Sequence, residues 1–360
     1  MTRRFNPEPG RNARTRRERR RRIHTGLIAL LSLALLVAAD AGARAADWAT
    51  VVMYHRFGED SAPSTNIRLD QFDVHLAELA SGAYTPMAVD AILARLAAGE
   101  ALPDRTVAIT VDDAFLSVYT EAWPRLKAAG IPFTLFVATE PIDQGLAGYM
   151  TWDQIRELAA DGVTIGSQTA AHPHMPAMSA ERNREELARS NARFEAELGS
   201  RPTLFAYPYG EYGNAVREIV AEAGFAAAFG QHSGVMHGGM DAYSLPRFAM
   251  NEKYGSIGRF RLAVNAMPLR VRDLTPADTV LRQNPPLFGF TIDDEIDNLD
   301  QLACFASNQS GPATIERLGQ TRFEVRLDGP FAAGRGRVNC TLPGPDRRWR
   351  WYGIQFFIPG

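Results

Sequence analysis

Residues 106–115, Thr-Val-Ala-Ile-Thr-Val-Asp-Asp-Ala-Phe, decide how the rest of this 360-residue chain is interpreted. Five of the six residues before the acids are β-branched, which is typical of a buried strand. Asp112 and Asp113 follow where that strand should end. Adjacent carboxylates repel each other, and burying them is costly unless something compensates their charge. Either these acids cap the next helix, or one binds a metal ion while its neighbour acts as a general base.

The composition is that of a globular protein, with 46% hydrophobic and 22% charged residues. The net charge of −2 hides an arginine-rich segment at residues 1–45 and a distinctly acidic remainder. Because the positive charge is not on the folded part, nucleic acid is not an expected partner. The only cysteines, Cys304 and Cys340, would pair in an oxidising compartment or remain as two buried thiols.

The first 45 residues have the pattern of a signal peptide. Residues 16–22 are mostly arginine, residues 26–39 are apolar, and residues 43–45 form a small-x-small cleavage site. The apolar run is shorter than the roughly 20 residues that span a bilayer. We expect a periplasmic or secreted protein without a stable membrane span after cleavage. An uncleaved anchor is the alternative. The pair Arg16-Arg17 also suggests export by the twin-arginine route.

Strands and helices alternate between residues 49 and 248, which indicates an α/β fold with a largely parallel sheet. Polar residues repeatedly follow the expected strands. Examples are His55, the two acids, Gln168 and residues 207–209. In a parallel barrel the carboxyl ends of the strands form one face, where catalytic residues gather. We therefore expect these side chains to meet.

The pattern of apolar and turn-forming residues changes towards the C-terminus. Residues 276–286 resemble a linker, and residues 287–360 contain short apolar runs separated by Gly, Pro and Asn turns. This pattern predicts a small β-sandwich. Trp349 and Trp351 would form either a sugar-binding platform or one face of a strand.

Three stretches carry a family resemblance through their order and spacing. They are residues 110–113 (Thr-Val-Asp-Asp), 168–173 (Gln-Thr-Ala-Ala-His-Pro) and 206–209 (Ala-Tyr-Pro-Tyr). Together they resemble the T-F-D-D, H-[ST]-x-x-H-P and R-x-P-[YF] motifs of the polysaccharide deacetylase family, also called carbohydrate esterase family 4 or the NodB-homology group. The resemblance implies a distorted (β/α)7-type barrel with parallel strands over residues 46–275.

The resemblance also implies roles for individual residues. Asp112 would be the general base that activates a water. Asp113 and His172 would hold a divalent metal ion of the Zn, Co or Ni type, and the backbone N–H of Tyr209 would help hold the oxyanion. The implied activity is hydrolysis of N-acetyl groups on a β-linked amino-sugar polysaccharide. An esterase acting on O-acetyl groups would use the same site.

The general acid of the family normally comes from a late Leu-x-His motif, which is missing here. Residues 53–56, Met-Tyr-His-Arg, instead resemble the rearranged branch of poly-β-1,6-N-acetylglucosamine N-deacetylases. This implies that His55 is the acid; the alternative is a histidine hydrogen-bonded at a strand end. Ala206 stands where the family usually has arginine, and Arg247 would supply the missing positive charge.

Gln168 replaces the first metal-binding histidine of the family motif. An amide oxygen is usually a weaker ligand than imidazole for zinc-like ions. Three alternatives remain open. Gln168 ligates directly beside Asp113 and His172, His174 replaces it, or the metal site is degraded and the protein binds glycans without turnover.

Overall fold

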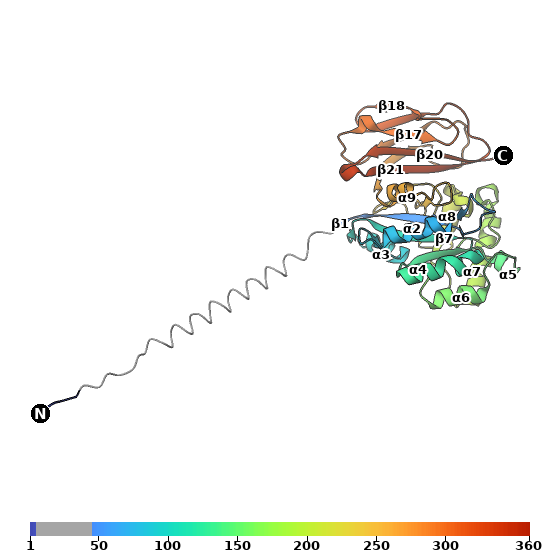
Figure 1. The fold of residues 1–360 in the computed structure, drawn as a ribbon. Helices are drawn as coiled ribbons and strands as arrows, with labels where there is room; N and C mark the ends of the chain where they lie inside the picture. Colours follow the sequence, from blue (N-terminus) through green and yellow to red (C-terminus); the bar gives the residue numbers. More distant parts are fainter. Residues whose placement is uncertain (5–44) are drawn as a thin grey trace. The chain divides into compact units, whose positions relative to one another are not determined.

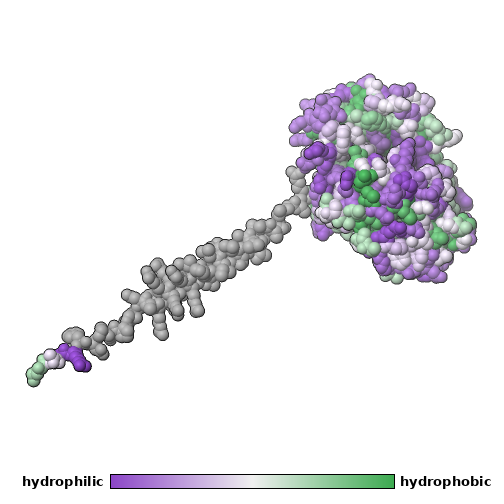
Figure 2. Space-filling model, viewed as in Figure 1, coloured by the Kyte–Doolittle hydropathy of each residue, from purple (hydrophilic) through white to green (hydrophobic). Residues whose placement is uncertain are grey.

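The computed structural model describes residues 1–4 and 45–360 (Figure 1). The predicted signal peptide therefore falls almost entirely outside the described residues. Residues 46–360 form one compact unit. Within the described ranges, no helix combines the length and the apolar character that crossing a bilayer requires. Polar side chains cover most of the face shown in Figure 2.

The centre of this unit is a nine-stranded, curled sheet with mostly parallel strands. Along its main path lie β11 (Ala227–Phe229), β10 (Leu204–Ala206), β9 (Thr164–Ser167), β8 (Phe133–Val137), β7 (Thr106–Asp112), β2 (Trp48–Tyr54) and β12 (Met236–His237). β13 (Phe248–Ala249) pairs with β2 and β5 (Thr85–Pro86) with β7, both in parallel, whereas β12 is antiparallel to β2. The expected α/β class with a curled parallel sheet is confirmed.

The helices follow the sequence signals at their ends. They are α2 (Leu69–Leu79), α3 (Val89–Ala97), α4 (Trp123–Ala129), α5 (Thr139–Asp143), α6 (Trp152–Ala160), α7 (Ala180–Leu198), α8 (Asn214–Glu222) and α9 (Ile257–Val264). Thr151 forms the N-terminal capping box of α6. Pro124 lies at the start of α4, directly after a π-helical turn at Val118–Ala122, because proline is tolerated only in the first turn.

The strand that ends in Asp112 is buried over its whole length. All seven residues of β7 are buried, and it lies between β2 and β8. Met53 of β2 pairs with Thr110 of β7, so the two strands end at the same edge. This register places His55, which follows β2, beside the acids that follow Val111.

The C-terminal part consists of two four-stranded sheets. One contains β14 (Met267–Pro268), β21 (Trp349–Ile358), β20 (Gly334–Pro343) and β17 (Ala303–Ala306); the other contains β15 (Val271–Thr275), β16 (Phe288–Ile292), β19 (Arg322–Arg326) and β18 (Thr314–Leu318). Cys304 and Cys340 form a disulfide between opposed positions of β17 and β20. β14 and β15 join these sheets although they precede the expected linker, whose domain boundaries stay a prediction.

The short strands complete the described chain. They are β1 (Ala45–Ala46), β3 (Arg56–Phe57), β4 (Asn66–Ile67) and β6 (Leu102–Pro103), and β3 pairs with β4 in parallel. Asn66 accepts a hydrogen bond from the backbone of Glu59, which ties the loop after β3 to β4.

The C-terminal sheets pack directly on the curled sheet. Trp351 of β21 makes an edge-to-face contact with Phe248 of β13, with ring centroids 5.3 Å apart. A Cβ atom at Gly353 would lie 2.0 Å from the carbonyl oxygen of Ser233, so only glycine permits this approach of β21. β21 therefore borders the region into which the catalytic candidates point.

Candidate active site

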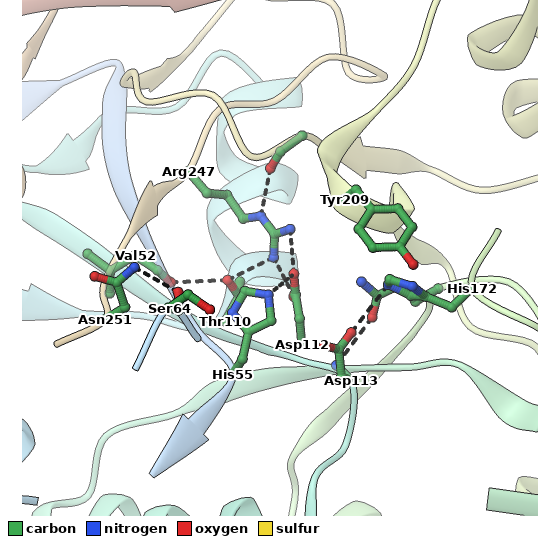
Figure 3. Close-up of polar contacts among 12 residues, drawn as sticks. Val52, His55, Ser64, Thr110, Asp112, Asp113, His172, Tyr209, Arg247 and Asn251 are labelled. Carbon is green, nitrogen blue, oxygen red and sulfur yellow. Dashed lines mark hydrogen bonds and ion pairs between the residues drawn. The ribbon is translucent and has the colours of Figure 1, made fainter. Parts of the chain in front are cut away.

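The candidate residues meet at the carboxyl edge of the sheet, although they lie far apart in the sequence (Figure 3). His55 follows β2, and Asp112 ends β7 with Asp113 directly after it. Gln168 follows β9 and Tyr209 follows β10. Non-glycine residues in the left-handed region concentrate here, with φ values of 75° at Asp113, 56° at His172 and 59° at Tyr209. Such costly backbone conformations cluster at functional sites.

Asp112 is fully buried and paired with an equally buried guanidinium. Arg247 Nη1 and Nη2 donate to its two carboxylate oxygens at 2.6 and 2.9 Å. The guanidinium is itself held by the carbonyl of Gly230 at 2.9 Å and by Thr110 Oγ1 at 3.2 Å. This bidentate fork compensates the buried charge and fixes the orientation of the carboxylate. The predicted contact between Arg247 and Asp112 is thus present.

His55 stands next to this pair (Figure 3). Its Nε2 lies 3.8 Å from Asp112 Oδ2, and its side chain is 12% exposed. The imidazole therefore reaches both the buried carboxylate and the solvent-accessible space beside it. This is a suitable position for a group that exchanges protons with a substrate.

Asp113 faces His172 across a short gap. Asp113 Oδ1 and His172 Nε2 are 3.4 Å apart, and neither buried atom has a hydrogen-bond partner among the described residues. Burial favours the neutral form of Asp113, but the neighbouring His172, His55 and Arg56 outweigh this and lower its pKa. Buried groups are normally hydrogen-bonded, so this exception requires an explanation.

Gln168 lies beneath these two residues and is fully buried. Its Oε1 accepts the backbone N–H of Asp113 at 3.2 Å, while its Nε2 has no partner among the described residues. The amide oxygen keeps one lone pair, since a carbonyl can accept two hydrogen bonds. Gln168 therefore orients the backbone of Asp113 and stays close enough to remain a ligand candidate.

His174 is engaged elsewhere. Its Nδ1 lies 2.7 Å from Glu211 Oε2, and its ring stacks on Tyr209 with centroids 4.1 Å apart. The ring of His172 also contacts Tyr209, in an edge-to-face arrangement with ring centroids 4.5 Å apart. The three aromatic rings thus form one packed unit that fixes the turn after β10.

The arrangement of donors fits a divalent cation in part. Asp113 and His172 offer an oxygen and a nitrogen that are buried, unpartnered and close enough to share one ion. The third donor would be a neutral amide, because no three His, Cys, Asp or Glu side chains gather as a ligand group in the described part of the chain. The candidate metal centre therefore has two good ligands and a weak third one.

Several residues of the site carry no sequence signal that would have identified them. Gln355 of β21 donates to the carbonyl of Tyr209 at 3.0 Å, and Arg335 of β20 lies over the Tyr209 ring at 5.7 Å. Both come from the C-terminal sheets, more than 120 positions after the turn they support. Thr110 was predicted only as the first residue of the motif at residues 110–113. In the structure its hydroxyl also donates a hydrogen bond to the carbonyl of Val52.

Comparisons with known proteins agree with this geometry. Residues 99–228 match the sequence model of the Polysaccharide deacetylase family. The Bacillus subtilis protein YxkH is 24% identical over 197 residues, which cover 55% of this chain and 69% of that protein. This chain therefore contains a polysaccharide deacetylase domain of the NodB type, the domain that carbohydrate esterase family 4 shares.

Solved structures show the same fold. The Streptococcus pyogenes deacetylase PplD, solved in complex with acetate, superimposes with a TM-score of 0.56 at 22% identity, over 60% of this chain and 98% of that chain. IcaB from Ammonifex degensii superimposes with a TM-score of 0.53 at 28% identity, over 58% of this chain and 94% of that chain. The matched share agrees with a deacetylase domain that occupies the larger part of residues 46–360.

Proposed function

We propose that this protein is an exported, metal-dependent deacetylase that hydrolyses N-acetyl groups of an amino-sugar polysaccharide. One observation carries the proposal. Asp113 Oδ1 and His172 Nε2 face each other at 3.4 Å without a hydrogen-bond partner in the described chain, directly beside the Asp112–Arg247 pair and His55. A bound divalent cation would polarise the acetamide carbonyl and lower the pKa of a water molecule.

The residues of the chain then divide the proton transfers. Asp112 accepts a proton as the water oxygen bonds to the carbonyl carbon, and Arg247 keeps its carboxylate in place. The backbone N–H of Tyr209 supports the oxyanion that develops on the former carbonyl oxygen. His55 Nε2 gives a proton to the amine nitrogen as the carbon–nitrogen bond breaks. The products are acetate and a free amine on the sugar.

Acetate release from N-acetylglucosamine oligomers tests this proposal. We expect release that stops after chelation and returns when Zn²⁺, Co²⁺ or Ni²⁺ is added. Release that is unchanged by chelation would contradict the metal requirement. Absence of release with every one of these ions would contradict the activity itself.

A second candidate function rests on Gln168. Its Oε1 already accepts a hydrogen bond from Asp113, which weakens it further as a metal ligand. The protein would then bind glycans without hydrolysing them. Oligosaccharide binding by calorimetry, without acetate release under any divalent ion, would favour this candidate.

A further inference from the structure

A cavity of about 420 Å³ opens beside His55 and is walled by the C-terminal sheets. Residues of β20 and β21 line it together with residues that follow β2 and β13. Its charged lining side chains are Arg259, Arg335 and Arg337. Among the described residues that line the cavity, none is an aspartate or a glutamate. The wall next to the proposed acid is therefore basic.

The positive charges of this wall are poorly compensated. Arg337 Nε donates to the neutral amide of Gln355 at 2.9 Å. Arg259 lies over Trp351 at 5.1 Å, and its buried Nη1 has no hydrogen-bond partner within the described chain. Burial lowers the pKa of both guanidinium groups, because desolvation disfavours their charge. Both side chains are half-buried, so their charge is partly desolvated, and an anion in the cavity would compensate it.

Arg335 forms an ion pair with a carboxylate. Its Nε lies 3.6 Å from Glu211 Oε1, but His174 already shares that carboxylate at 2.7 Å. The Arg335 guanidinium also lies over the ring of Tyr209. Arg335 thus connects the cavity to the turn that supports the proposed oxyanion site.

The remaining lining suits a sugar. Trp351 and Tyr254 offer aromatic surface, and Asn251, Ser64 and Thr65 offer polar groups. Carbohydrate sites combine an aromatic face with a few placed polar groups in this way. Figure 3 shows Ser64 and Asn251 on the same side of Asp112 as His55.

We propose that this cavity binds an anionic sugar next to the sugar whose N-acetyl group is removed, so that the preferred substrate is an acidic amino-sugar polymer. The anionic group is a carboxylate or a phosphate, because guanidinium forks match the geometry of both oxyanions. This proposal rests on the proposed deacetylase function. The same wall disfavours a glucosamine ammonium group, so a fully deacetylated neighbour would be a poor occupant.

The test compares three oligosaccharides of equal length. One is a neutral N-acetylglucosamine hexamer, one alternates N-acetylglucosamine with glucuronic acid, and one carries phosphate on O6 of its N-acetylglucosamine residues. We expect kcat/KM for acetate release to be about tenfold higher for at least one acidic oligomer, the size of one charge-assisted hydrogen bond. The preference should appear mainly in KM and should decrease with added salt.

Variants locate the preference in the cavity. Arg337→Gln and Arg259→Gln should reduce the ratio between acidic and neutral oligomers to about one, while Arg337→Lys should keep part of it. Arg326→Gln is the matched control, since Arg326 is an exposed residue of the same sandwich that pairs with Glu316. It should leave the ratio unchanged.

The outcomes separate the two proposals. Equal kcat/KM for all three oligomers in the wild type, or a preference that survives both glutamine variants, would overturn the acidic substrate and leave the deacetylase intact. No acetate from any oligomer would overturn the deacetylase. Calorimetric binding of the same three oligomers would then decide whether the cavity selects acidic glycans.

Discussion

Asp112 and Asp113 are neighbours in the chain, yet their carboxylates differ in their hydrogen bonding. Both oxygens of Asp112 accept hydrogen bonds from a buried guanidinium. Asp113 turns away through a left-handed backbone and points its Oδ1 at His172, where it has no partner among the described residues. The difference teaches that the first carboxylate is held in a fixed orientation, as the proposed base would need, whereas the second has the free oxygen that a proposed metal ligand would need.

The histidines of the chain divide in the same way. His75 is fully buried in the core, and its two nitrogens bond Tyr54 Oη and the carbonyl of Gly255, both at 2.9 Å. His172 Nε2 faces Asp113 and has no hydrogen-bond partner in residues 45–360. Atoms without a hydrogen-bond partner also occur elsewhere in the described chain, so it is the short distance between Asp113 Oδ1 and His172 Nε2 that marks the proposed ligand site.

The largest effect should follow removal of the proposed base. We expect Asp112→Asn to reduce the rate of acetate release by about 10²–10⁴-fold, because an amide cannot accept the proton. Asp90→Asn, at an exposed position of α3, is the matched control. Circular dichroism verifies that both variants fold. A rate within twofold of the wild type would mean that Asp112 is only structural.

The next effect concerns the compensating charge. Arg247→Met should destabilise the protein by about 3–5 kcal/mol, because Asp112 is then buried without a partner. Arg182→Met removes an exposed pair with Glu185 instead and should cost less than about 1 kcal/mol. Urea denaturation measures both. Equal losses in the two variants would show that the buried pair has no special weight.

The free energy of unfolding should depend on pH through the buried side chain of His75. Burial lowers the pKa of His75 to about 4, whereas the unfolded chain titrates near pH 6.5. The unfolded state then binds the extra proton, so the contribution is complete above about pH 6.5 and decreases towards pH 4. We expect the wild type to lose up to roughly 3 kcal/mol more than His75→Gln over this range. Parallel curves from urea titrations at each pH would contradict this.

The smallest expected effect concerns metal affinity at Asp113 and its neighbour Gln168. Gln168→His should raise the affinity for Zn²⁺ on the order of tenfold or more, since imidazole is the better ligand. Metal content of the purified proteins and competition with a chelator measure the change. Gln231→His, at the rim of the cavity, is the control. An unchanged affinity would argue that residue 168 lies outside the coordination sphere.

The sheet and its functional edge were predictable because the information is local. A β-branched run, alternating helices and polar residues at strand ends are visible within short windows. In the structure His55, the two acids and Gln168 do follow neighbouring strands at one edge of the sheet, and their predicted roles stay predictions. The predicted contact of Arg247 with Asp112 was a longer inference and required the family resemblance. Its carbonyl partner, Gly230, was not predicted, because backbone acceptors have no sequence signature.

The start of the sandwich and its share in the site were not predictable in the same way. β14 has only two residues and β15 precedes a proline-rich stretch. The sequence therefore does not predict that either strand belongs to the C-terminal sheets. The contact of Gln355 with Tyr209 depends on how two distant parts pack. The burial of His232, which is 4% exposed and accepts the backbone N–H of Arg247 through its carbonyl, likewise has no local sequence signal.

The close approach of β21 has a practical consequence for anyone who shortens this protein. A fragment ended at residue 266 would lose Gln355, Arg337 and Trp351 together, so it would lack part of the boundary of its own reaction chamber. Exchanging the terminal sandwich between related enzymes should accordingly transfer glycan selectivity, although the reacting groups themselves would stay where they are.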